Sequence, residues 1–215
     1  MSINQTLENL RGSYRNASFD ISDANSRPEI QFDSWFKDAV ATECDEPNAF
    51  VLSTVFNGQP RARVVLLKGI HNENFAFYTN YNSAKGAELA NNSHVAMTFL
   101  WLPLQRQIRI EGTLQKIDPA FSDEYFQKRP RGNQIGAIAS PQSQKVASRH
   151  ELEKLFMDAD KQYSNQAEIK RPEHWGGYTI TPTYFEFWQG RENRMHDRII
   201  YEKNSQGWHL SRLAP

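Results

Sequence analysis

The spacing of apolar residues changes from a helical to a strand-like period near Ala49. Upstream, Pro28 stands where prolines are favoured in the first turn of a helix. Behind it, apolar residues repeat at helical spacing at Phe32, Trp35, Phe36, Ala39 and Val40. The pattern predicts a helix that begins at Pro28 and is stopped by Glu46-Pro47-Asn48. The preceding residues 1–27 are expected to be a polar, mobile segment with a short helix over residues 5–14.

Downstream of Ala49 the chain has the pattern of short strands joined by turns. Asn57-Gly58, a strong hairpin signal, joins expected strands at residues 49–56 and 61–68. The other expected strands are residues 75–79, 94–102, 105–117, 178–181, 184–189, 197–203 and 208–212. Helices are expected at residues 84–90 behind Ser83, from Asp118-Pro119 to about Lys128, and behind Ser148. Because most neighbouring strands have no helix between them, the pattern predicts a single domain of α+β class, with an antiparallel sheet or barrel and attached helices.

The charge balance narrows the class of partners. Lys plus Arg and Asp plus Glu both number 25, so the formal net charge is zero. A neutral chain lacks the basic field that binds nucleic acid or a membrane surface nonspecifically. Cys44 is the one cysteine, so no disulfide can form within the chain, which fits a reducing compartment and a cytoplasmic location. We find no signal peptide and no apolar run long enough to span a membrane.

The segment Arg194-Met195-His196-Asp197-Arg198 carries the most informative polar pattern. If the strand period of the following residues extends back through it, Arg194, His196 and Arg198 share one face. Two guanidiniums beside an imidazole make a surface rich in donors, which suits a flat anionic ligand. The alternative is an edge strand whose charges are simply solvated.

Two further segments are candidate anion sites. Arg63 and Lys68 end an apolar strand, and strict alternation places them on opposite faces unless a bulge intervenes. The alternative is an ordinary core strand with charged ends. Lys85 lies in the first turn of the helix behind Ser83, where backbone N–H groups favour an anion, although ordinary capping explains the pattern about as well.

Two polar stretches are open to both functional and ordinary interpretations. Gln107, Arg109 and Glu111 share a strand face opposite Ile108 and Ile110, where they either bond a heterocycle or face solvent. Residues 125–137, with residues 140–145 behind them, are rich in Arg, Gly, amide and Ser residues. Such a loop suits phosphate recognition, and a flexible solvated loop is the alternative.

The sequence gives little support for a metal site or for a catalytic nucleophile. The six histidines are scattered, and no H-E-x-x-H, C-x-x-C or G-x-S-x-G motif occurs. Several separated anion sites with aromatic and amide surfaces favour a site for phosphorylated heterocycles. The difficult chemistry would then come from a bound cofactor.

Taken together, these segments resemble the pyridoxine/pyridoxamine 5′-phosphate oxidase family over nearly the whole chain. No single motif is decisive, but all of them occur in the expected order. The motifs are Arg63–Lys68, Phe77–Asn80, Arg129-Pro-Arg131 with Gln134–Ala137, Gln142-Ser143, Glu186–Gly190, Arg194–Arg198 and the terminal Arg212–Pro215.

The resemblance implies an FMN-binding split β-barrel that forms a homodimer, with the flavin at the subunit interface. Residues 172–215 would complete the site and the dimer. The activity it implies is oxidation of pyridoxine or pyridoxamine 5′-phosphate to pyridoxal 5′-phosphate, by hydride transfer from C4′ to flavin N5 and reoxidation by O2 to give H2O2. The implied FMN contacts are Arg63, Val64, Val65, Leu66, Leu67, Lys68, Tyr78, Thr79, Lys85, Gln107, Gln142, Ser143, Trp188 and Arg198.

The resemblance also implies which residues hold the substrate. Its phosphate would be bound by Lys68, Tyr125, Arg129 and Asn133, and Arg194 and His196 would close over the pyridine ring as the catalytic pair. Arg11 and Tyr14 match an N-terminal segment that can cover the site. Three residues depart from the family pattern: Ala84 stands for Arg, Asn133 for Ser and Ile138 for Trp. The first departure is expected to weaken FMN binding.

Two other functions remain possible on the sequence. A related flavin oxidase of phenazine biosynthesis would not need the phosphate-binding set of Lys68, Tyr125 and Arg129. A flavin-binding or pyridoxal-phosphate-binding protein without catalytic activity would keep the phosphate sites but would not need Arg194 and His196. The presence of both sets favours the oxidase.

Overall fold

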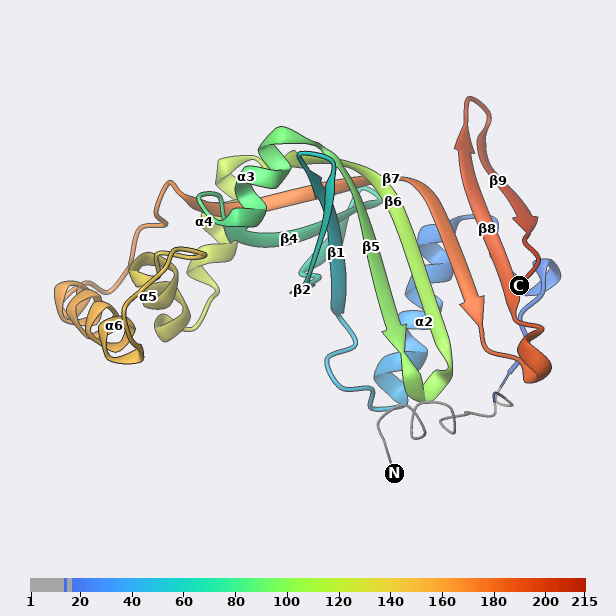
Figure 1. Cartoon of the computed structure of the whole chain (residues 1–215), viewed down its shortest axis with the longest axis horizontal. Coiled ribbons are helices and arrows are strands. Elements are labelled where there is room, and N and C mark those ends of the chain that lie inside the picture. Colours follow the sequence, from blue (N-terminus) through green and yellow to red (C-terminus); the bar gives the residue numbers. More distant parts are fainter. Residues whose placement is uncertain (1–13, 15–16) are drawn as a thin grey trace. The chain divides into compact units, whose positions relative to one another are not determined.

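The computed structural model describes Tyr14 and residues 17–215, so the expected helix at residues 5–14, apart from Tyr14, lies outside the described residues, as does Arg11. Figure 1 labels most of the helices and strands. In chain order they are η1 (Ile21–Asp23), α2 (Pro28–Ala41), β1 (Ala49–Phe56), β2 (Gln59–Leu66), β3 (Gly69–His71), β4 (Asn74–Asn80), α3 (Ala84–Asn91), β5 (His94–Trp101), η2 (Leu102–Leu104), β6 (Arg106–Lys116), α4 (Pro119–Gln127), α5 (Arg131–Ala139), α6 (Arg149–Tyr163), β7 (Trp175–Gln189), η3 (Glu192–Arg194), β8 (Asp197–Asn204) and β9 (Gly207–Arg212).

The strands of the described chain form a nine-stranded sheet in the order β2-β1-β5-β6-β7-β4-β3, with β8 on β7 and β9 on β8. The β1–β2 hairpin pairs Ala49 with Leu66, so the predicted turn at Asn57-Gly58 is present. The pairings of β3 with β4, β4 with β7, β7 with β8 and β8 with β9 are also antiparallel. These pairings confirm the predicted α+β fold with a mainly antiparallel sheet.

The chain forms two compact units, each assembled from segments that are distant in sequence. The central unit consists of Ala49–Ala96 and Glu111–Pro182. The terminal unit consists of Met1–Asn48, Met97–Ile110 and Thr183–Pro215. One boundary, between Asn48 and Ala49, coincides with the change from helical to strand-like spacing, and the other three fall inside β5, β6 and β7, where no change of composition could mark them.

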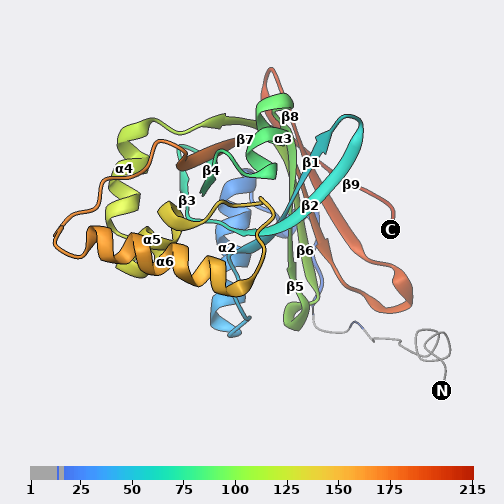
Figure 2. The same ribbon diagram turned by 60° about the vertical axis from the view of Figure 1, so that its left-hand side comes forward.

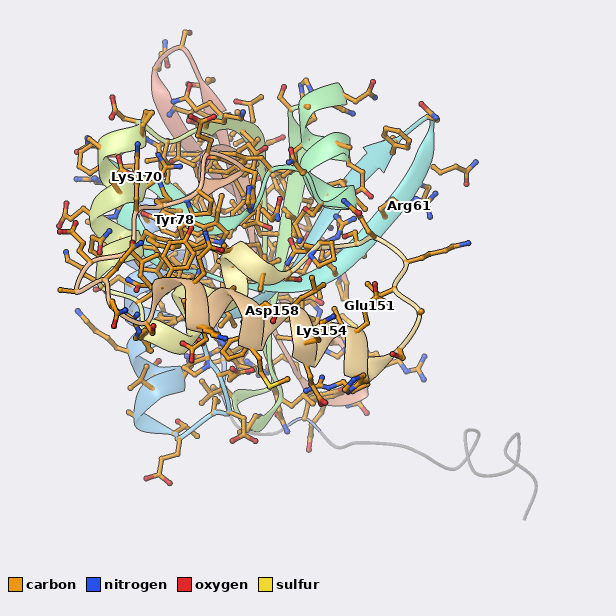
Figure 3. All side chains as sticks on the ribbon, turned by 90° about the vertical axis from the view of Figure 1, so that its left-hand side faces the viewer. Arg61, Tyr78, Glu151, Lys154, Asp158 and Lys170 are labelled. Carbon is orange, nitrogen blue, oxygen red and sulfur yellow. The ribbon has the colours of Figure 1, made fainter. Side chains whose placement is uncertain are left out.

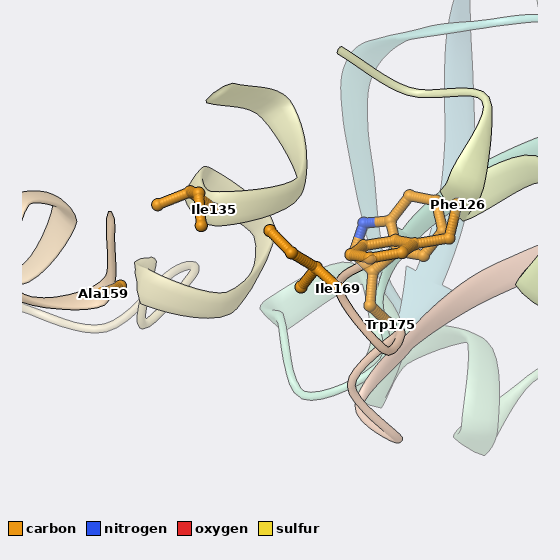
Figure 4. Close-up of a cluster of buried hydrophobic side chains, with 5 residues drawn as sticks. All are labelled: Phe126, Ile135, Ala159, Ile169 and Trp175. Atoms are coloured by element: carbon orange, nitrogen blue, oxygen red, sulfur yellow. The ribbon is translucent and has the colours of Figure 1, made fainter. Parts of the chain in front are cut away.

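In the central unit, α5 and α6 lie side by side (Figure 2). Ile135 of α5, Ala159 of α6 and Ile169 belong to one buried cluster, together with Phe126 and Trp175 (Figure 4). The prediction that residues 125–137 form a loop is wrong over its second half, which belongs to α5, and this cluster explains why. The glycines and Asn133 have poor helix propensity, but burial of Ile135 outweighs it.

In the terminal unit, α2 lies where its apolar spacing predicted a helix. Phe32 packs edge-on against Phe99 of β5, with ring centroids 5.1 Å apart. Trp35 packs in the same way on Phe187 of β7 at 5.2 Å. Val40, expected on the same face, is instead 53% exposed, because the helix ends one residue later at Ala41.

Strand β7 also differs from the prediction, which divided it at Pro182. Pairing with β4 ends at Ile180, and pairing with β8 begins at Tyr184. Proline has no N–H to donate to a ladder, and Pro182 lies between these two partners, so it does not interrupt either pairing. One strand from Trp175 to Gln189 therefore replaces the two that were expected.

Helix α6 begins at the predicted cap. The Ser148 hydroxyl accepts a hydrogen bond from the N–H of Glu151 at 3.2 Å, and the Glu151 carboxylate accepts one from the N–H of Ala147 at 2.7 Å. Figure 3 shows Glu151, Lys154 and Asp158 along the exposed part of this helix. No helix among the described residues, α6 included, is long and apolar enough to cross a membrane.

Gly86, in the first turn of α3, is a position where the backbone excludes a side chain. A Cβ there would lie 1.9 Å from the carbonyl oxygen of Tyr81. We expect Gly86→Ala to lower the free energy of unfolding by about 1–3 kcal/mol. Gly132→Ala is the matched control, because a Cβ in the first turn of α5 meets nothing within 4 Å. It should be neutral or stabilising by up to about 1 kcal/mol. Urea denaturation of both variants checks this, and equal effects would contradict the packing described.

Candidate functional site

A cleft of about 850 Å³ opens in the central unit. Most of the residues that the sequence assigned to cofactor and substrate phosphate in this unit line it. They are Arg63, Val64, Val65, Leu66, Lys68, Tyr78, Thr79, Lys85, Tyr125, Arg129, Asn133 and Gln142. Leu67, which is buried in the core, and Ser143, which has a left-handed φ of 71°, are not among the lining residues.

Arg63 and Lys68 both line this cleft, which corrects the prediction that they lie on opposite faces. Strand β2 ends at Leu66, so strict alternation no longer applies to Lys68. The Lys68 N–H donates to the carbonyl of Ala76 at 2.8 Å, which holds the connection against β4. Both cations are therefore available to one ligand.

Arg63 is held from behind by a buried carboxylate. Its guanidinium forms an ion pair with Glu88 and donates to the hydroxyl of Thr54 at 2.7 Å. Thr54 in turn donates to Glu88 at 2.7 Å. A guanidinium fixed in this way presents a preorganised charge to the cleft.

Lys85 completes the same end of the cleft. Its ammonium donates to the hydroxyl of Thr79 at 3.0 Å and to the side-chain oxygen of Gln142 at 3.2 Å. Burial lowers the pKa of Lys85, and the positive charge of Arg63 lowers it further. Two like charges brought together at a helix N-terminus are stabilised by an anion between them.

Stacked aromatic rings form another wall. Tyr78 stacks on Tyr125 with centroids 3.9 Å apart and on Trp175 at 5.6 Å (Figure 3 labels Tyr78). The guanidinium of Arg129 lies over the Trp175 ring, 4.5 Å from its centroid. Trp175 was missed by the sequence analysis, because it reaches Arg129 only through tertiary packing and no local motif marks it.

The Arg129 side chain has an unused donor. Its Nη2 donates to the carbonyl of Asn133 at 3.0 Å, but its buried Nε has no hydrogen-bond partner among the described residues. Burial lowers the pKa of this guanidinium, so its charge is poorly solvated. Buried donors are rarely left unpaired, and the rest of this guanidinium belongs to a side chain that lines the cleft, where its charge suits an anion.

The charge of the lining is one-sided. Arg63, Lys68, Lys85, Lys128 and Arg129 line the cleft, and no Asp or Glu of the described chain does. Two glutamates that do not line the cleft form ion pairs with two of these cations. Glu88 pairs with Arg63, and Glu124 pairs with Lys128 at 2.5 Å. The cleft is thus suited to a ligand with more than one negative charge. No group of His, Cys, Asp and Glu within the described residues could hold a metal ion.

The other predicted site residues belong to the terminal unit, among them Arg194 and His196. The strand period that would place Arg194, His196 and Arg198 on one face does not extend back to Arg194, because β8 begins only at Asp197. Residues Glu192–Arg194 form the 3₁₀ turn η3, in which Asn193 and Arg194 have left-handed φ values of 56° and 61°. Arg194 is exposed at the end of this turn.

The His196 ring lies against two aromatic rings. Its centroid is 4.5 Å from that of Trp188 and 5.6 Å from that of Tyr14, which approaches edge-on. Its Nδ1 lies 3.1 Å from the backbone N of Arg191 and accepts that N–H. The neutral ring then carries its proton on Nε2, which makes this atom a donor.

Arg198 lies on β8 and Gln107 on β6, two strands that both pair with β7. The Arg198 Nε donates to the buried carboxylate of Glu186 at 2.7 Å, and Arg109 reaches the other oxygen of Glu186 at 3.1 Å. The predicted alternation of β6 is confirmed, because Ile108 and Ile110 are fully buried while Gln107 and Arg109 are partly exposed.

The surroundings of His196 predict its protonation state. Burial lowers the pKa of His196 below the ordinary 6.5, and Arg194 lowers it further, against an opposing effect of Asp197. We therefore expect a neutral ring at pH 7, and protonation only as the pH falls below 6.5. Arg194→Gln should raise the pKa, because it removes a positive charge. NMR titration of the ring protons measures both values; a pKa above 6.5 in the unaltered protein would contradict this environment.

Comparison with known proteins gives consistent matches. The family described as pyridoxamine 5′-phosphate oxidase matches residues 36–163, and the pyridoxine 5′-phosphate oxidase C-terminal dimerisation region matches residues 175–215. A pyridoxine/pyridoxamine 5′-phosphate oxidase of Leptospira interrogans is 50% identical over 211 residues, which cover 97% of this chain and 98% of the relative. One of Salinibacter ruber is 49% identical over 212 residues, covering 97% and 99%.

Solved structures share the fold. PhzG from Burkholderia lata 383, in complex with tetrahydrophenazine-1-carboxylic acid, superposes with a TM-score of 0.87 at 25% identity, over 95% of this chain and 100% of that one. A pyridoxamine 5′-phosphate oxidase-related, FMN-binding protein from Nostoc punctiforme has a TM-score of 0.71 at 16% identity, over 89% and 100%. The second similarity concerns the fold alone.

Proposed function

Because the chain belongs to the pyridoxamine 5′-phosphate oxidase family, we propose that it oxidises pyridoxine and pyridoxamine 5′-phosphate to pyridoxal 5′-phosphate, with FMN as cofactor. The observation that carries the proposal is the cleft of the central unit, which five cations and no described carboxylate line. When bound, FMN supplies the hydride acceptor and is reoxidised by O2, which gives H2O2. The protein's part is to bind the cofactor and the substrate, to orient them, and to exclude water from the site.

The end of the cleft formed by Arg63 and Lys85 is suited to the FMN phosphate. The two cations lie close enough for Arg63 to lower the pKa of Lys85, and Thr79 and Gln142 fix the ammonium. Ala84 stands exposed at the first position of α3 and offers no donor there beyond its backbone. Arg63 and Lys85 would therefore hold the phosphate without the arginine usual in the family.

The substrate phosphate is assigned to Lys68, Tyr125, Arg129 and Asn133, all of which line the same cleft. The Arg129 guanidinium, which lies over Trp175 at the wall of this cleft, supports the assignment, since guanidinium N–H groups bind phosphate oxygens well. Ile138, where the family often has Trp, packs against the hydrophobic cluster of the central unit. Its aliphatic side chain supports that cluster and adds no polar contact.

Arg194 and His196 are assigned to the pyridine ring. The guanidinium of Arg194 is exposed and can stack over a flat ring. Because the Nδ1 of His196 accepts from Arg191, its Nε2–H can donate to a polar substituent of the ring. Arg194 would orient the ring for hydride transfer, and His196 would hold or move a proton at its edge.

We propose a homodimer with the flavin at its interface, supported by the match of residues 175–215 to a dimerisation region. Subunit complementation tests this. At a substrate concentration near the KM of the unaltered enzyme, mixed dimers of Arg129→Ala and Arg194→Ala subunits should regain activity that both homodimers largely lack, because one of their two sites then keeps both arginines. Tandem purification with two tags isolates the mixed dimer. If one subunit supplied a whole site, mixed dimers would be as inactive as their parents.

An aerobic assay separates this function from its nearest alternative. Since PhzG was solved with a phenazine precursor, oxidation of such precursors is the competing activity. We expect turnover of pyridoxamine and pyridoxine 5′-phosphate with one H2O2 released per pyridoxal phosphate. Pyridoxamine without its phosphate should react poorly at the same concentration, because it leaves Arg129 unpaired. Equal turnover with and without phosphate, or a preference for tetrahydrophenazine-1-carboxylic acid, would refute the proposal.

A cytoplasmic location stays a prediction, which rests on the single cysteine. Cys44 is buried, and burial raises the pKa of its thiol, so it is held in its unreactive form.

A further inference from the structure

We propose that Asp197 is the positioning residue of the Arg194–His196 turn, and that it acts by joining three separate segments of the terminal unit. The inference rests on the proposed function, because it gives this turn a part in substrate binding. Asp197 is not among the described residues that line the cleft, and its role is to position the turn that carries Arg194 and His196.

The carboxylate of Asp197 is fully engaged. Its Oδ2 accepts the backbone N–H of Phe19 at 3.1 Å and the Nη1–H of Arg191 at 3.0 Å. Its Oδ1 accepts the Nη1–H of Arg212 at 2.8 Å. One side chain therefore connects the segment before η1, the residue before η3 and the end of β9.

The bond to Arg191 extends to His196. While the Arg191 guanidinium is bound by Asp197, the Arg191 backbone N–H donates to Nδ1 of His196. The side chain of Asp197 thus fixes the residue whose main chain sets the tautomer and direction of the imidazole. This is the logic of an outer residue that orients a functional histidine through its second ring nitrogen.

The turn between Arg191 and His196 needs a restraint of this kind, because its backbone conformation is unfavourable. Asn193 and Arg194 both have left-handed φ values, 56° and 61°, which are unfavourable for residues with a side chain. Such conformations persist where surrounding contacts over-determine them. Asp197 holds both ends of this turn, because it bonds Arg191 on one side and begins β8 on the other.

The residues after β9 form further hydrogen bonds with Arg198, the residue that follows Asp197. The N–H of Leu213 donates to the carbonyl of Arg198 at 2.9 Å, and the Arg198 Nη1 donates to the carbonyl of Ala214 at 2.9 Å. Arg212 also contacts Asp20 at 3.3 Å. Burial opposes ionisation of Asp197, but the hydrogen bonds from Arg212 and Phe19 lower its pKa overall, so the carboxylate remains charged at neutral pH.

The test compares Asp197→Asn, Arg191→Gln and the double variant in the FMN-loaded enzyme. We expect Asp197→Asn to lower kcat by roughly 10- to 100-fold while the dissociation constant of FMN stays within about threefold. Because both residues act through one connection, the double variant should be little worse than the more damaged single variant. Glu153→Gln, which breaks the exposed Arg149–Glu153 pair of α6, is the control and should leave kcat unchanged.

Two further measurements test the role of Asp197 without measuring turnover. Hydrogen exchange of the Phe19 amide should speed up in Asp197→Asn and not in Glu153→Gln. The pKa of His196 should fall in Asp197→Asn, because the negative charge of Asp197 beside the ring is lost. If the unaltered enzyme fails to oxidise either substrate, the proposed function fails, and these readings still test the connection. Unchanged Phe19 exchange, or losses of kcat that multiply in the double variant, would overturn the proposal.

Discussion

Replacing Arg194 by Ala is expected to lower kcat/KM for pyridoxamine 5′-phosphate by about 10²- to 10³-fold, the usual cost of losing one donor that acts on the reacting group. The affinity for FMN should change far less. Arg194 is exposed at the end of η3 and belongs to the terminal unit, whereas the cations that line the cleft belong to the central unit. Its loss should therefore affect the orientation of the substrate's pyridine ring and leave the binding of the flavin phosphate unchanged.

Steady-state kinetics and a fluorescence titration with FMN measure the two effects on the same preparation. Arg149→Ala is the matched control, because Arg149 is also an exposed arginine, in α6, and its ion pair within the described chain is a surface contact of small energy with the nearby Glu153 at 2.8 Å. It should leave both quantities unchanged. Equal losses of kcat/KM and FMN affinity in Arg194→Ala would refute the assignment of this residue to the substrate.

The second large effect is expected at Arg129. Arg129→Ala should raise KM for both substrates by roughly 10- to 100-fold, the equivalent of about 1.5–3 kcal/mol for a charge-assisted hydrogen bond. Its guanidinium lines the cleft and forms no ion pair among the described residues, so the truncation removes a charge that is available to the phosphate of the ligand. The effect should be much smaller for substrates that lack the phosphate.

Arg131→Ala is the control for this prediction. Arg131 lies two residues further on but donates to the carbonyls of Gln166 at 3.1 Å and Tyr163 at 2.6 Å, and it does not line the cleft. Its replacement should lower stability slightly and leave KM as it was. An unchanged KM in Arg129→Ala would remove Arg129 from the phosphate site.

Local signals predicted the elements they control. The proline at the start of α2, the Asn57-Gly58 turn and the Ser148 cap each act through contacts within a few residues, and all three appear where the sequence placed them. The same holds for the β6 alternation, because burial of Ile108 and Ile110 follows from the strand period alone.

Features that depend on distant contacts were not predictable in this way. Helix α5 forms because Ile135 is buried beside Ala159 and Ile169, against the propensity of its own residues. Lys68 joins Arg63 only because β2 ends early. The turn at Arg194 departs from strand geometry, and the contacts that hold it come from Phe19 and Arg212, more than a hundred residues away in one case.

The candidate site shows the same division. Its cations could be named from motifs, because anion recognition depends on residue types that the sequence displays. The aromatic wall could not, since the approach of Trp175 to Tyr78 and Arg129 depends on the fold. The same is true of the Glu88 carboxylate behind Arg63, which gives the guanidinium its fixed position.

An anaerobic titration tests the central claim most directly. The purified protein is loaded with FMN, freed of oxygen and mixed with pyridoxine 5′-phosphate while the oxidised-flavin absorbance is followed. We expect rapid bleaching, its reversal on admitting air, and formation of pyridoxal phosphate in an amount equal to the flavin reduced. A protein that binds FMN but does not bleach with this substrate or with pyridoxamine 5′-phosphate would contradict the proposed activity, and one that fails to bind FMN would contradict the assignment of the cleft.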